Sequence, residues 1–432
     1  MKKYIIILVL ILILSCKTNS KVENIDKVVE EYVRLVLEIG EYDDSFVDAY
    51  FGPENWKPTQ AKKETFPFNN FVQRANRLLD QCDVILETKD PDLEVARIEM
   101  LKKQLIAVRT KVEMIGGKTY DFDEEARLLY DAEPPHFSAS HFDDLLEDLD
   151  SLLTGEGDLQ SRYNNYMAAF IIPIEKLDTV FRVAIDKARK ITKTHFDLPE
   201  NENFILEYVT EKVWGGYNYY QGNSQSLIQI NTDFPIYINR AIDLASHEGY
   251  PGHHVYMMLI EQNMVNEKGW MEFSVYPLFS PLSLIAEGSA NYGIDVVFPG
   301  ENRIEFEKNY LFPISGIDLN EADKFYEVQH LLSKLNYARN ETARDYLNGD
   351  ITHEEAVKQI EKYSLFTPEK AKQSIAFIEK NRSYIINYNV GKDMVSKHVE
   401  LSGGTYDNKE KRWLVFKELL SNPYTASTLK QD

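Results

Sequence analysis

Cysteine is almost absent from this chain, which has only Cys16 and Cys82 among its 432 residues. A framework of disulfides, the usual support of small exported domains, is therefore excluded. Cys82 lies within an amphipathic helical pattern that includes Leu78 and Leu79. We expect Cys82 to be a buried and unreactive thiol.

Glycine (20) and proline (16) are also scarce for this length, which disfavours a protein built from many hairpins. Apolar residues instead recur every three or four positions through most of the chain. The clearest stripe runs from Val95 to Ile115; Asp90-Pro91 precedes it as a typical helix start, and Gly116-Gly117 closes it. These patterns predict a mainly α protein, and the 44% hydrophobic content is ample for a buried core.

Repeats and low-complexity linkers are missing as well. We therefore expect residues 23-200 to form a helical N-terminal part that packs with residues 201-432, the catalytic part, in one compact unit. The helices before residue 200 are expected to form a wall of the substrate cleft. Positive charge is scarce too: the net charge is −21, and it would be −23 without the two lysines of residues 1-15. Such a surface repels nucleic acid, and no basic block argues otherwise.

Long apolar runs are absent after the first fifteen residues. Tyr4 to Leu14 is an unbroken apolar run of eleven residues behind two lysines, which is too short to cross a bilayer but typical of an export signal. Ile13-Leu14-Ser15-Cys16 follows and resembles a bacterial lipobox, in which the signal is removed before a lipidated cysteine. We expect residues 1-15 to be a lipoprotein signal peptide, Cys16 the lipidation site and 16-22 a tether. The chain would then be exported and held to a membrane by this anchor only.

One stretch departs from the helical pattern. Residues 214–222 are rich in glycine and aromatic side chains, and Ser226 to Asn231 alternates like a strand. Thr232-Asp233 then resembles a helix start. A strand that leads directly into a helix can present an exposed edge, which binds an extended peptide through backbone hydrogen bonds. We therefore predict a small β-strand edge at the active site.

Histidines gather where that helix ends. Three of the nine in the chain, His247, His253 and His254, lie within eight residues, and Glu248 follows the first. Neutral imidazoles and carboxylates are the ligands that zinc prefers in catalytic sites. In the common HExxH motif, two histidines four residues apart share one helical face. Here the fourth position is Pro251, so the geometry must differ.

A regular helix cannot bring the next histidines to His247. His253 would lie about 240° around the axis, and His254 about 10.5 Å further along it. Pro251 and Gly252 permit a distortion, because proline removes a helical hydrogen bond and glycine tolerates unusual dihedral angles. Two residues absorbed in a bulge would return His253 to the place of the second ligand. Whether His254 replaces it stays open.

The segment His247-Glu-x-x-Pro-Gly-His253 resembles the signature of a bacterial family of unknown function, DUF family 885. Its members look like zinc metallopeptidases of the gluzincin type, and their motif Glu-Gly-Trp-Ala-x-Tyr supplies the third ligand. Here that motif reads Glu287 to Tyr292, with serine in place of tryptophan. The resemblance covers roughly the last half of the chain and extends to Tyr388-Asn-Val-Gly391 and Leu419 to Pro423. A Phe-His-Asp triplet common in the family is here Phe416-Lys-Glu.

The resemblance implies a helical, gluzincin-like fold and a zinc ion held by His247, His253 and Glu287. Glu287 lies in an apolar helical run, where a carboxylate is costly to bury unless it meets a metal or a cation. Such an ion activates water, and Glu248 is the expected general base. The family resemblance and the chemistry of its hydroxyl make Tyr388 the first candidate for the donor that stabilises the oxyanion.

The remaining polar residues of this region receive supporting roles. Asn291, one helical turn after Glu287, and His254 are expected in the second shell around the ligands. Arg382 and Lys392 are candidates for gripping a substrate carboxylate, which would make the enzyme a carboxypeptidase, and solvated charges are the alternative. The other histidines are expected to be structural or exposed: His136, His141, His195, His330, His353 and His398.

We therefore expect a zinc-dependent hydrolase, a metallopeptidase with a peptide substrate. Two alternatives remain. The same ligands would serve a zinc-binding surface lipoprotein without catalysis, or a hydrolase of a non-peptide amide or ester.

Overall fold

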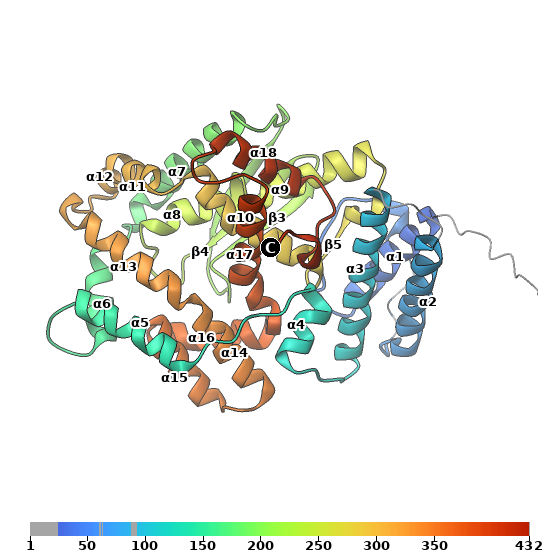
Figure 1. Cartoon of the computed structure of the whole chain (residues 1–432), viewed down its shortest axis with the longest axis horizontal. Coiled ribbons are helices and arrows are strands. Elements are labelled where there is room, and N and C mark those ends of the chain that lie inside the picture. Colours follow the sequence, from blue (N-terminus) through green and yellow to red (C-terminus); the bar gives the residue numbers. More distant parts are fainter. Residues whose placement is uncertain (1–24, 60–61, 63, 88–92, 432) are drawn as a thin grey trace, which may run out of the picture.

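The computed structural model describes residues 25–59, 62, 64–87 and 93–431. It is 67% helix and 8% strand, which confirms the prediction of a mainly α fold. Figure 1 shows helices surrounding a small sheet and a central helix. The expected signal peptide, the tether, the lipidation site Cys16 and the helix start Asp90-Pro91 lie outside the described residues.

The elements follow one another along the chain with short connections. The helices are α1 (Ile25–Gly40), α2 (Phe68–Leu86), α3 (Leu93–Ile115), α4 (Phe122–Tyr130), α5 (Ala139–Leu152), α6 (Leu159–Met167), α7 (Leu177–Lys193), α8 (Asn239–Leu244), α9 (His253–Leu259), α10 (Pro281–Val297), α11 (Glu301–Phe306), α12 (Phe312–Ser315), α13 (Ala322–Lys334), α14 (Ala338–Asn348), α15 (His353–Ser364), α16 (Pro368–Asn381), α17 (Ile386–Leu401) and α18 (Lys409–Leu420). The strands are β1 (Val47–Tyr50), β2 (Asn203–Val209), β3 (Gly216–Gly222), β4 (Gln225–Asn231) and β5 (Val275–Pro277).

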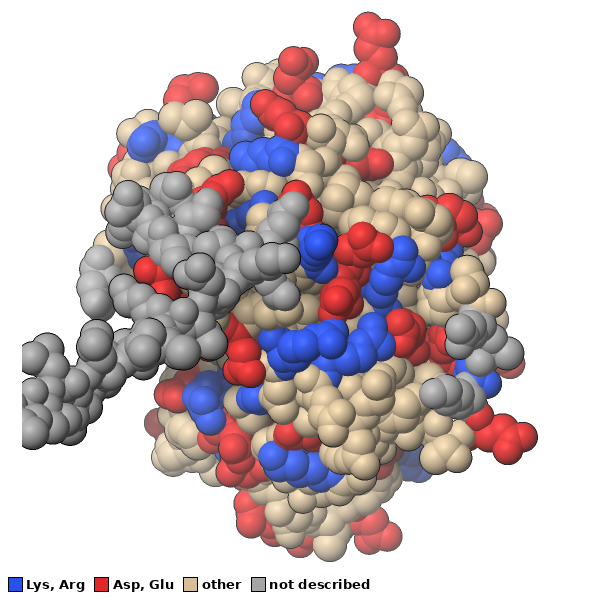
Figure 2. All heavy atoms as spheres, turned by 90° about the vertical axis from the view of Figure 1, so that its right-hand side faces the viewer, with Lys and Arg blue, Asp and Glu red and all other residues tan. Residues whose placement is uncertain are grey.

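Helices α1, α2 and α3 stack side by side at one end of the molecule (Figure 1). α3 ends at Ile115, where the glycine pair was expected to stop it, and Gly117 has a φ of +97°. Such an angle suits glycine, because other residues are strained there. Cys82 is fully buried in α2, as predicted, and burial raises the pKa of its thiol to about 12. On the face that these helices form, Lys and Arg lie interspersed with Asp and Glu (Figure 2).

The three-stranded sheet corrects one expectation. Its order is β2-β4-β3, with β4 parallel to β2 and antiparallel to β3. The strand predicted over Ser226 to Asn231 is therefore the central strand β4, and both of its edges are already paired. It cannot offer backbone groups to a peptide. The edge strand beside the candidate site is β3, whose residues 216–220 line a cavity. The helix expected from Thr232 begins only at Asn239.

Helix α10 is the centre of the fold, and almost all of its residues are buried. It crosses α17 at a contact between two glycines. A Cβ atom added to Gly288 would lie 2.4 Å from the carbonyl oxygen of Gly391, and one added to Gly391 would lie 2.7 Å from the carbonyl oxygen of Leu284. The backbones therefore touch, which only glycine permits. This contact places the segment Glu287-Gly288 of α10 directly against the segment Tyr388 to Gly391 of α17.

Buried apolar side chains from Val28 to Leu429 form one continuous core, with a small second cluster around Phe142. The division into 23-200 and 201-432 stays a prediction. No helix in the described part of the chain is long and apolar enough to cross a membrane.

Candidate metal centre

The chain makes a sharp turn between His247 and His253. α8 passes into one π-helical turn, Ala245–Gly249, and α9 starts at His253. Between them the Tyr250–Pro251 peptide bond is cis. The amide of Gly252 donates a hydrogen bond to the carbonyl of Ser246 over 2.9 Å. A Cβ atom on Gly252 would lie 1.9 Å from the carbonyl oxygen of His247, so this turn requires glycine.

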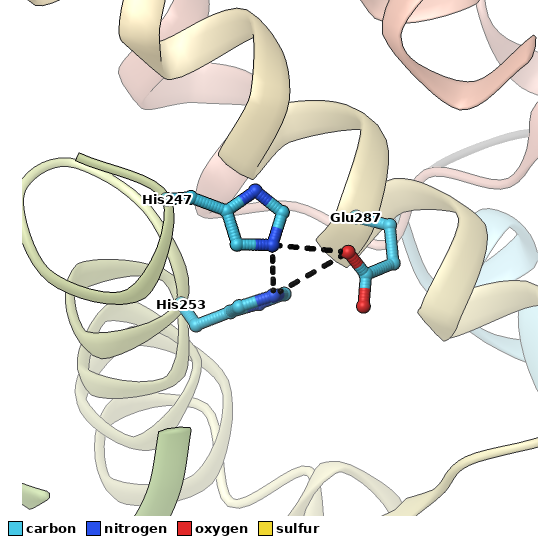
Figure 3. Close-up of side chains that lie close together, drawn as sticks. All are labelled: His247, His253 and Glu287. Atoms are coloured by element: carbon cyan, nitrogen blue, oxygen red, sulfur yellow. Dashed lines mark hydrogen bonds and ion pairs between the residues drawn. The ribbon is translucent and has the colours of Figure 1, made fainter. Parts of the chain in front are cut away.

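This turn brings the two imidazoles together, and Glu287 reaches them from α10 (Figure 3). The Nε2 atoms of His247 and His253 are 3.1 Å apart, and Glu287 Oε2 lies 3.2 Å from the first and 3.6 Å from the second. Ligand atoms at the usual zinc distances of about 2.0–2.2 Å lie roughly 3.3 Å from one another around a tetrahedral ion. The three side chains thus have the donor types and the spacing of a zinc site.

One carboxylate oxygen of Glu287 accepts a hydrogen bond, and the other accepts none from the described residues. Oε1 accepts a hydrogen bond of 2.6 Å from the hydroxyl of Tyr384. Oε2 is buried and has no hydrogen-bond donor among the described residues, only the two imidazoles. A buried carboxylate oxygen without a donor is costly, and a cation between the three groups would satisfy it.

Electrostatics point in the same direction. Burial alone would raise the pKa of Glu287, but His253 and His247 hold it far below its ordinary value. Burial alone would lower the pKa of His253, but Glu287, Glu248 and Asp48 raise it to about 9. Acidic groups dominate this part of the cavity, so the centre favours positive charge.

Asn291 contacts the His247 ring on the side away from the cluster. Its Oδ1 is 3.0 Å from Nδ1 of His247, and its Nδ2 donates to the carbonyl of Tyr388 over 2.9 Å. When Nδ1 of His247 carries the proton and donates it to this amide, Nε2 presents its lone pair to the cluster. Such an outer partner is usual for a metal-binding histidine, because it fixes both the ring and the tautomer.

Glu248 lies beside the cluster and lines the cavity. Its backbone carbonyl accepts a hydrogen bond from Asn218 Nδ2 on β3. A Cβ atom on Gly216 would come within 2.8 Å of Glu248 Oε1, so a bare backbone at that position leaves room for the carboxylate. Burial raises the pKa of Glu248, and His247 and His253 partly oppose that rise. A raised pKa suits a group that takes up and releases a proton near neutral pH.

The cluster opens on a cavity of about 1300 Å³. Its walls come from β3, from the start of β1, from α6, α8, α10, α13, α14 and α16, and from the start of α17. Among the elements before residue 200, only α6 and the segment 43–48 contribute to the lining. The N-terminal helices therefore form less of the cavity wall than predicted, because α1, α2 and α3 contribute no residue to its lining.

Tyr388 also lines the cavity, and its ring centroid lies 6.4 Å from that of His247. Burial and the nearby carboxylates of Glu287 and Glu248 hold the pKa of Tyr388 well above its ordinary value. Its hydroxyl therefore stays protonated and can donate a hydrogen bond.

One expectation for this region needs correction, and two candidates for substrate binding have partners within the protein. His254 does not reach the cluster: its Nδ1 lies 2.8 Å from Ser226 Oγ and its Nε2 3.5 Å from Glu202 Oε2. Consecutive residues of α9 point about 100° apart, so His253 and His254 face different surroundings. Arg382 Nε donates to Glu125 over 2.7 Å, and Lys392 pairs with Asp295 at 2.7 Å. Each cation therefore has a carboxylate partner, although the pair of Lys392 and Asp295 is partly exposed.

Tyr384 was missed by the sequence analysis. It stands one helical turn before Tyr388 and holds Glu287 directly. The preceding residue, Ser383, donates through its amide and its hydroxyl to Glu125. With 26 tyrosines in the chain, only the spacing from Tyr388 could have indicated it.

No protein-family model and no curated protein matches the sequence. Among solved structures, a Colwellia psychrerythraea protein described as a possible lipoprotein aligns with a TM-score of 0.51 and 14% identity, over 94% of this chain and 74% of that one. Metallocarboxypeptidase 1 of Trypanosoma cruzi aligns with a TM-score of 0.44 and 13% identity, over 93% of this chain and 92% of that chain. The first alignment shows a shared fold alone, and the second is too weak to support an argument. Membership of DUF family 885 stays a prediction.

Proposed function

We propose that this chain is a zinc-dependent hydrolase that cleaves peptide bonds, with His247, His253 and Glu287 as the metal ligands. One observation carries the proposal: two imidazole nitrogens and a carboxylate oxygen lie 3.1–3.6 Å apart beside a large cavity. A zinc ion with three protein ligands leaves a position open for water, as in catalytic rather than structural sites. Such an ion would acidify a water molecule and polarise the substrate carbonyl.

The protein groups around the cluster supply the remaining chemistry. Glu248 takes a proton from the attacking water as the water oxygen bonds to the carbonyl carbon, and passes that proton to the leaving nitrogen as the C–N bond breaks. Tyr388 donates a hydrogen bond to the oxygen that gains negative charge. Asn291 and Tyr384 keep His247 and Glu287 in position through the hydrogen bonds described above.

The test combines metal analysis with cleavage of a peptide library, with and without a chelator. We expect about one zinc per chain and cleavage that stops on chelation and returns with zinc. The variant Glu248→Gln should keep its zinc and lose roughly 100- to 10,000-fold in cleavage rate. Glu156→Gln, at an exposed loop position, is the matched control and should behave as the parent does.

The alternatives give different results. A zinc-binding protein without catalysis would hold the metal, cleave nothing and be unchanged by Glu248→Gln. A hydrolase of other amides or esters would leave the peptide library intact but turn over a small amide or ester in a Glu248-dependent manner. Absence of bound zinc after reconstitution would contradict all three.

We further propose that the chain is exported and anchored through a lipid on Cys16. The support is the short apolar run that ends in Ser15-Cys16. Labelling of cells with a radioactive fatty acid should mark the parent and leave the Cys16→Ser variant unmarked. An unmarked parent would exclude the anchor and leave the zinc site untouched.

A further inference from the structure

Among the described residues, six lysines and arginines line the cavity of this strongly acidic chain: Arg240, Arg303, Arg339, Lys370, Lys380 and Lys392. We call Arg240, Arg339 and Lys370 the cation triad. They come from three helices, α8, α14 and α16. The net charge of −21 makes a cluster of positive charge inside a cavity unusual, and like charges in contact destabilise a fold unless a ligand balances them.

Two members of the triad lack a carboxylate partner in the part of the chain that the structure describes. Arg339 and Lys370 make no ion pair with any described carboxylate, whereas Arg240 contacts Asp243 at 3.3 Å. Asp243 also pairs with Arg303 at 2.8 Å, and Arg303 in turn pairs with Glu307 at 2.9 Å. Asp243 and Glu307 therefore balance Arg240 and Arg303, and the net positive charge of this wall comes from Arg339 and Lys370.

Neutral groups hold two of the cations in place. Arg339 Nη2 donates to Ser374 Oγ over 3.2 Å, and its Nε is buried without a partner among the described residues. Lys370 Nζ donates to Gln373 Oε1 over 2.7 Å and lies 4.4 Å from the ring centroid of Phe234. Burial, then Arg339 and Arg240, lower the pKa of Lys370 to about 8, and the carboxylate of Asp233 opposes this only in part. The cations are thus oriented without losing their charge to a carboxylate.

A helix dipole adds to the positive potential at Lys370, which stands in the first turn of α16. A cation is unfavourable there, because the unpaired N–H groups at a helix N-terminus already carry partial positive charge. An anion beside the start of α16 would reverse this penalty. α14 adds no such dipole, because the short helical turn Leu335–Tyr337 joins it directly to α13.

The triad borders the same space as the candidate metal centre. Arg240 precedes His247 by seven residues, along α8 and the π-helical turn that follows it. Both side chains line the cavity, as do Arg339, Lys370 and Tyr388. A peptide that reaches the metal centre can therefore also contact the triad.

We propose that the cation triad binds the free C-terminal carboxylate of a peptide, so that the enzyme is a carboxypeptidase releasing single amino acids or short C-terminal fragments. This inference rests on the proposed hydrolase function and names its substrate class. The triad takes the role that the sequence analysis considered for Arg382 and Lys392.

The first experiment compares one peptide with a free C-terminal carboxylate and the same peptide with a C-terminal amide, using the zinc-loaded enzyme. The carboxylate form should have a kcat/KM roughly 10- to 100-fold higher, as expected for charge-assisted hydrogen bonds. Mass spectrometry should show products cut from the C-terminus. In Arg339→Gln and Lys370→Gln the preference should fall toward one. Lys372→Gln, at an exposed position of the same helix, is the control and should keep it. Equal cleavage of both peptides, or cuts at internal bonds alone, would overturn the proposal.

A binding experiment separates this proposal from the hydrolase function. The Glu248→Gln variant, loaded with zinc, is titrated with N-acetyl-phenylalanine and with its amide. The carboxylate should bind roughly 10- to 100-fold more tightly, and Arg339→Gln should remove that difference. If the carboxylate binds as expected but the parent enzyme cleaves no substrate, the carboxylate subsite is supported and the hydrolase function is refuted. Carboxylate binding that Arg339→Gln leaves unchanged but chelation abolishes would place the probe on the metal and refute the subsite.

Discussion

His253 and His254 are neighbours in the sequence, yet their imidazoles belong to two clusters of opposite character. His254 is fully buried, and its carboxylate partner Glu202 also accepts hydrogen bonds from Arg189, at 2.6 Å, and from Tyr250, at 2.5 Å. Both carboxylate oxygens of Glu202 therefore have hydrogen-bond donors, although His254 Nε2 itself is buried without a hydrogen-bond partner among the described residues. The cluster of His253 also combines imidazole with a buried carboxylate, but there Glu287 Oε2 has no hydrogen-bond donor among the described residues and the site borders a cavity.

The difference teaches how to distinguish a metal centre from a structural histidine. Residue types do not separate the two clusters, because each contains an imidazole and a buried carboxylate. The separation lies in whether the protein itself neutralises the carboxylate and whether solvent space adjoins it. A cluster that is already neutral gains little from a metal, whereas an incomplete one gains a great deal.

We expect the largest effect on zinc affinity when one of the predicted ligands His247, His253 and Glu287 is removed. His253→Ala should weaken zinc binding by more than the 10- to 100-fold typical of losing an outer partner, because it removes a ligand. Peptide cleavage should fall with the metal content. Competition with a chromogenic chelator measures the affinity. The control is His330→Ala, at an exposed position of α13, which should leave zinc bound. Undiminished zinc affinity in His253→Ala would remove the basis for the site.

A smaller effect is expected from the outer partner of Glu287. Tyr384→Phe removes only the hydroxyl that donates to Oε1 and should lower zinc affinity about 10- to 100-fold. Tyr310→Phe, at an exposed position, serves as the matched control. The same chelator competition applies. If both variants bind zinc as the parent does, Tyr384 has no part in holding the ligand.

Replacement of His254 should change the stability of the fold rather than its affinity for metal. His254→Gln disturbs the contacts with Ser226 and Glu202 and should lower the free energy of unfolding by about 1–3 kcal/mol. Zinc affinity should stay within about threefold of the parent, since none of the predicted ligands changes. Urea denaturation and chelator competition report the two quantities. Loss of zinc without loss of stability would reverse the roles assigned to the two histidines.

The smallest effect concerns pH. Burial alone would raise the pKa of Glu202, but His254, Tyr250 and Arg189 hold it below its ordinary value. The ionised carboxylate therefore stabilises the fold above its unfolded pKa of about 4.3, and this contribution is lost as the pH falls through the lower folded value. Glu202→Gln should reduce the steepness with which unfolding free energy falls below pH 5. Parallel urea denaturation curves at pH 7, 5 and 4 test this, and identical slopes would refute it.

The sequence predicted the helical fold because apolar periodicity is local and strong, as in the stripe that became α3. It also led to His247, His253 and Glu287 as a group: Pro251 and Gly252 permit a turn that joins the two histidines, and the resemblance to DUF family 885 implies Glu287 as the third ligand. The roles of these residues remain predictions until metal is measured.

The sequence could not assign features that depend on tertiary contacts. The strand over Ser226 to Asn231 has the alternation of an edge strand, and only its two pairings show that it is central. Likewise the sequence alone makes Arg382 a candidate for binding a substrate carboxylate. Only the structure shows that its guanidinium pairs with Glu125 instead. The cation triad is assembled from three helices whose sequences share no motif.

The glycine crossing of α10 and α17 has a consequence for how this site tolerates change. Glu287 sits beside Gly288, and Tyr388 sits three residues before Gly391, so the spacing between a predicted ligand and a candidate catalytic hydroxyl is set by two backbones in direct contact. Nothing compressible lies between them. One methyl group at either glycine would therefore shift Tyr388 relative to Glu287, whereas larger changes at the exposed positions of α17 leave that spacing alone.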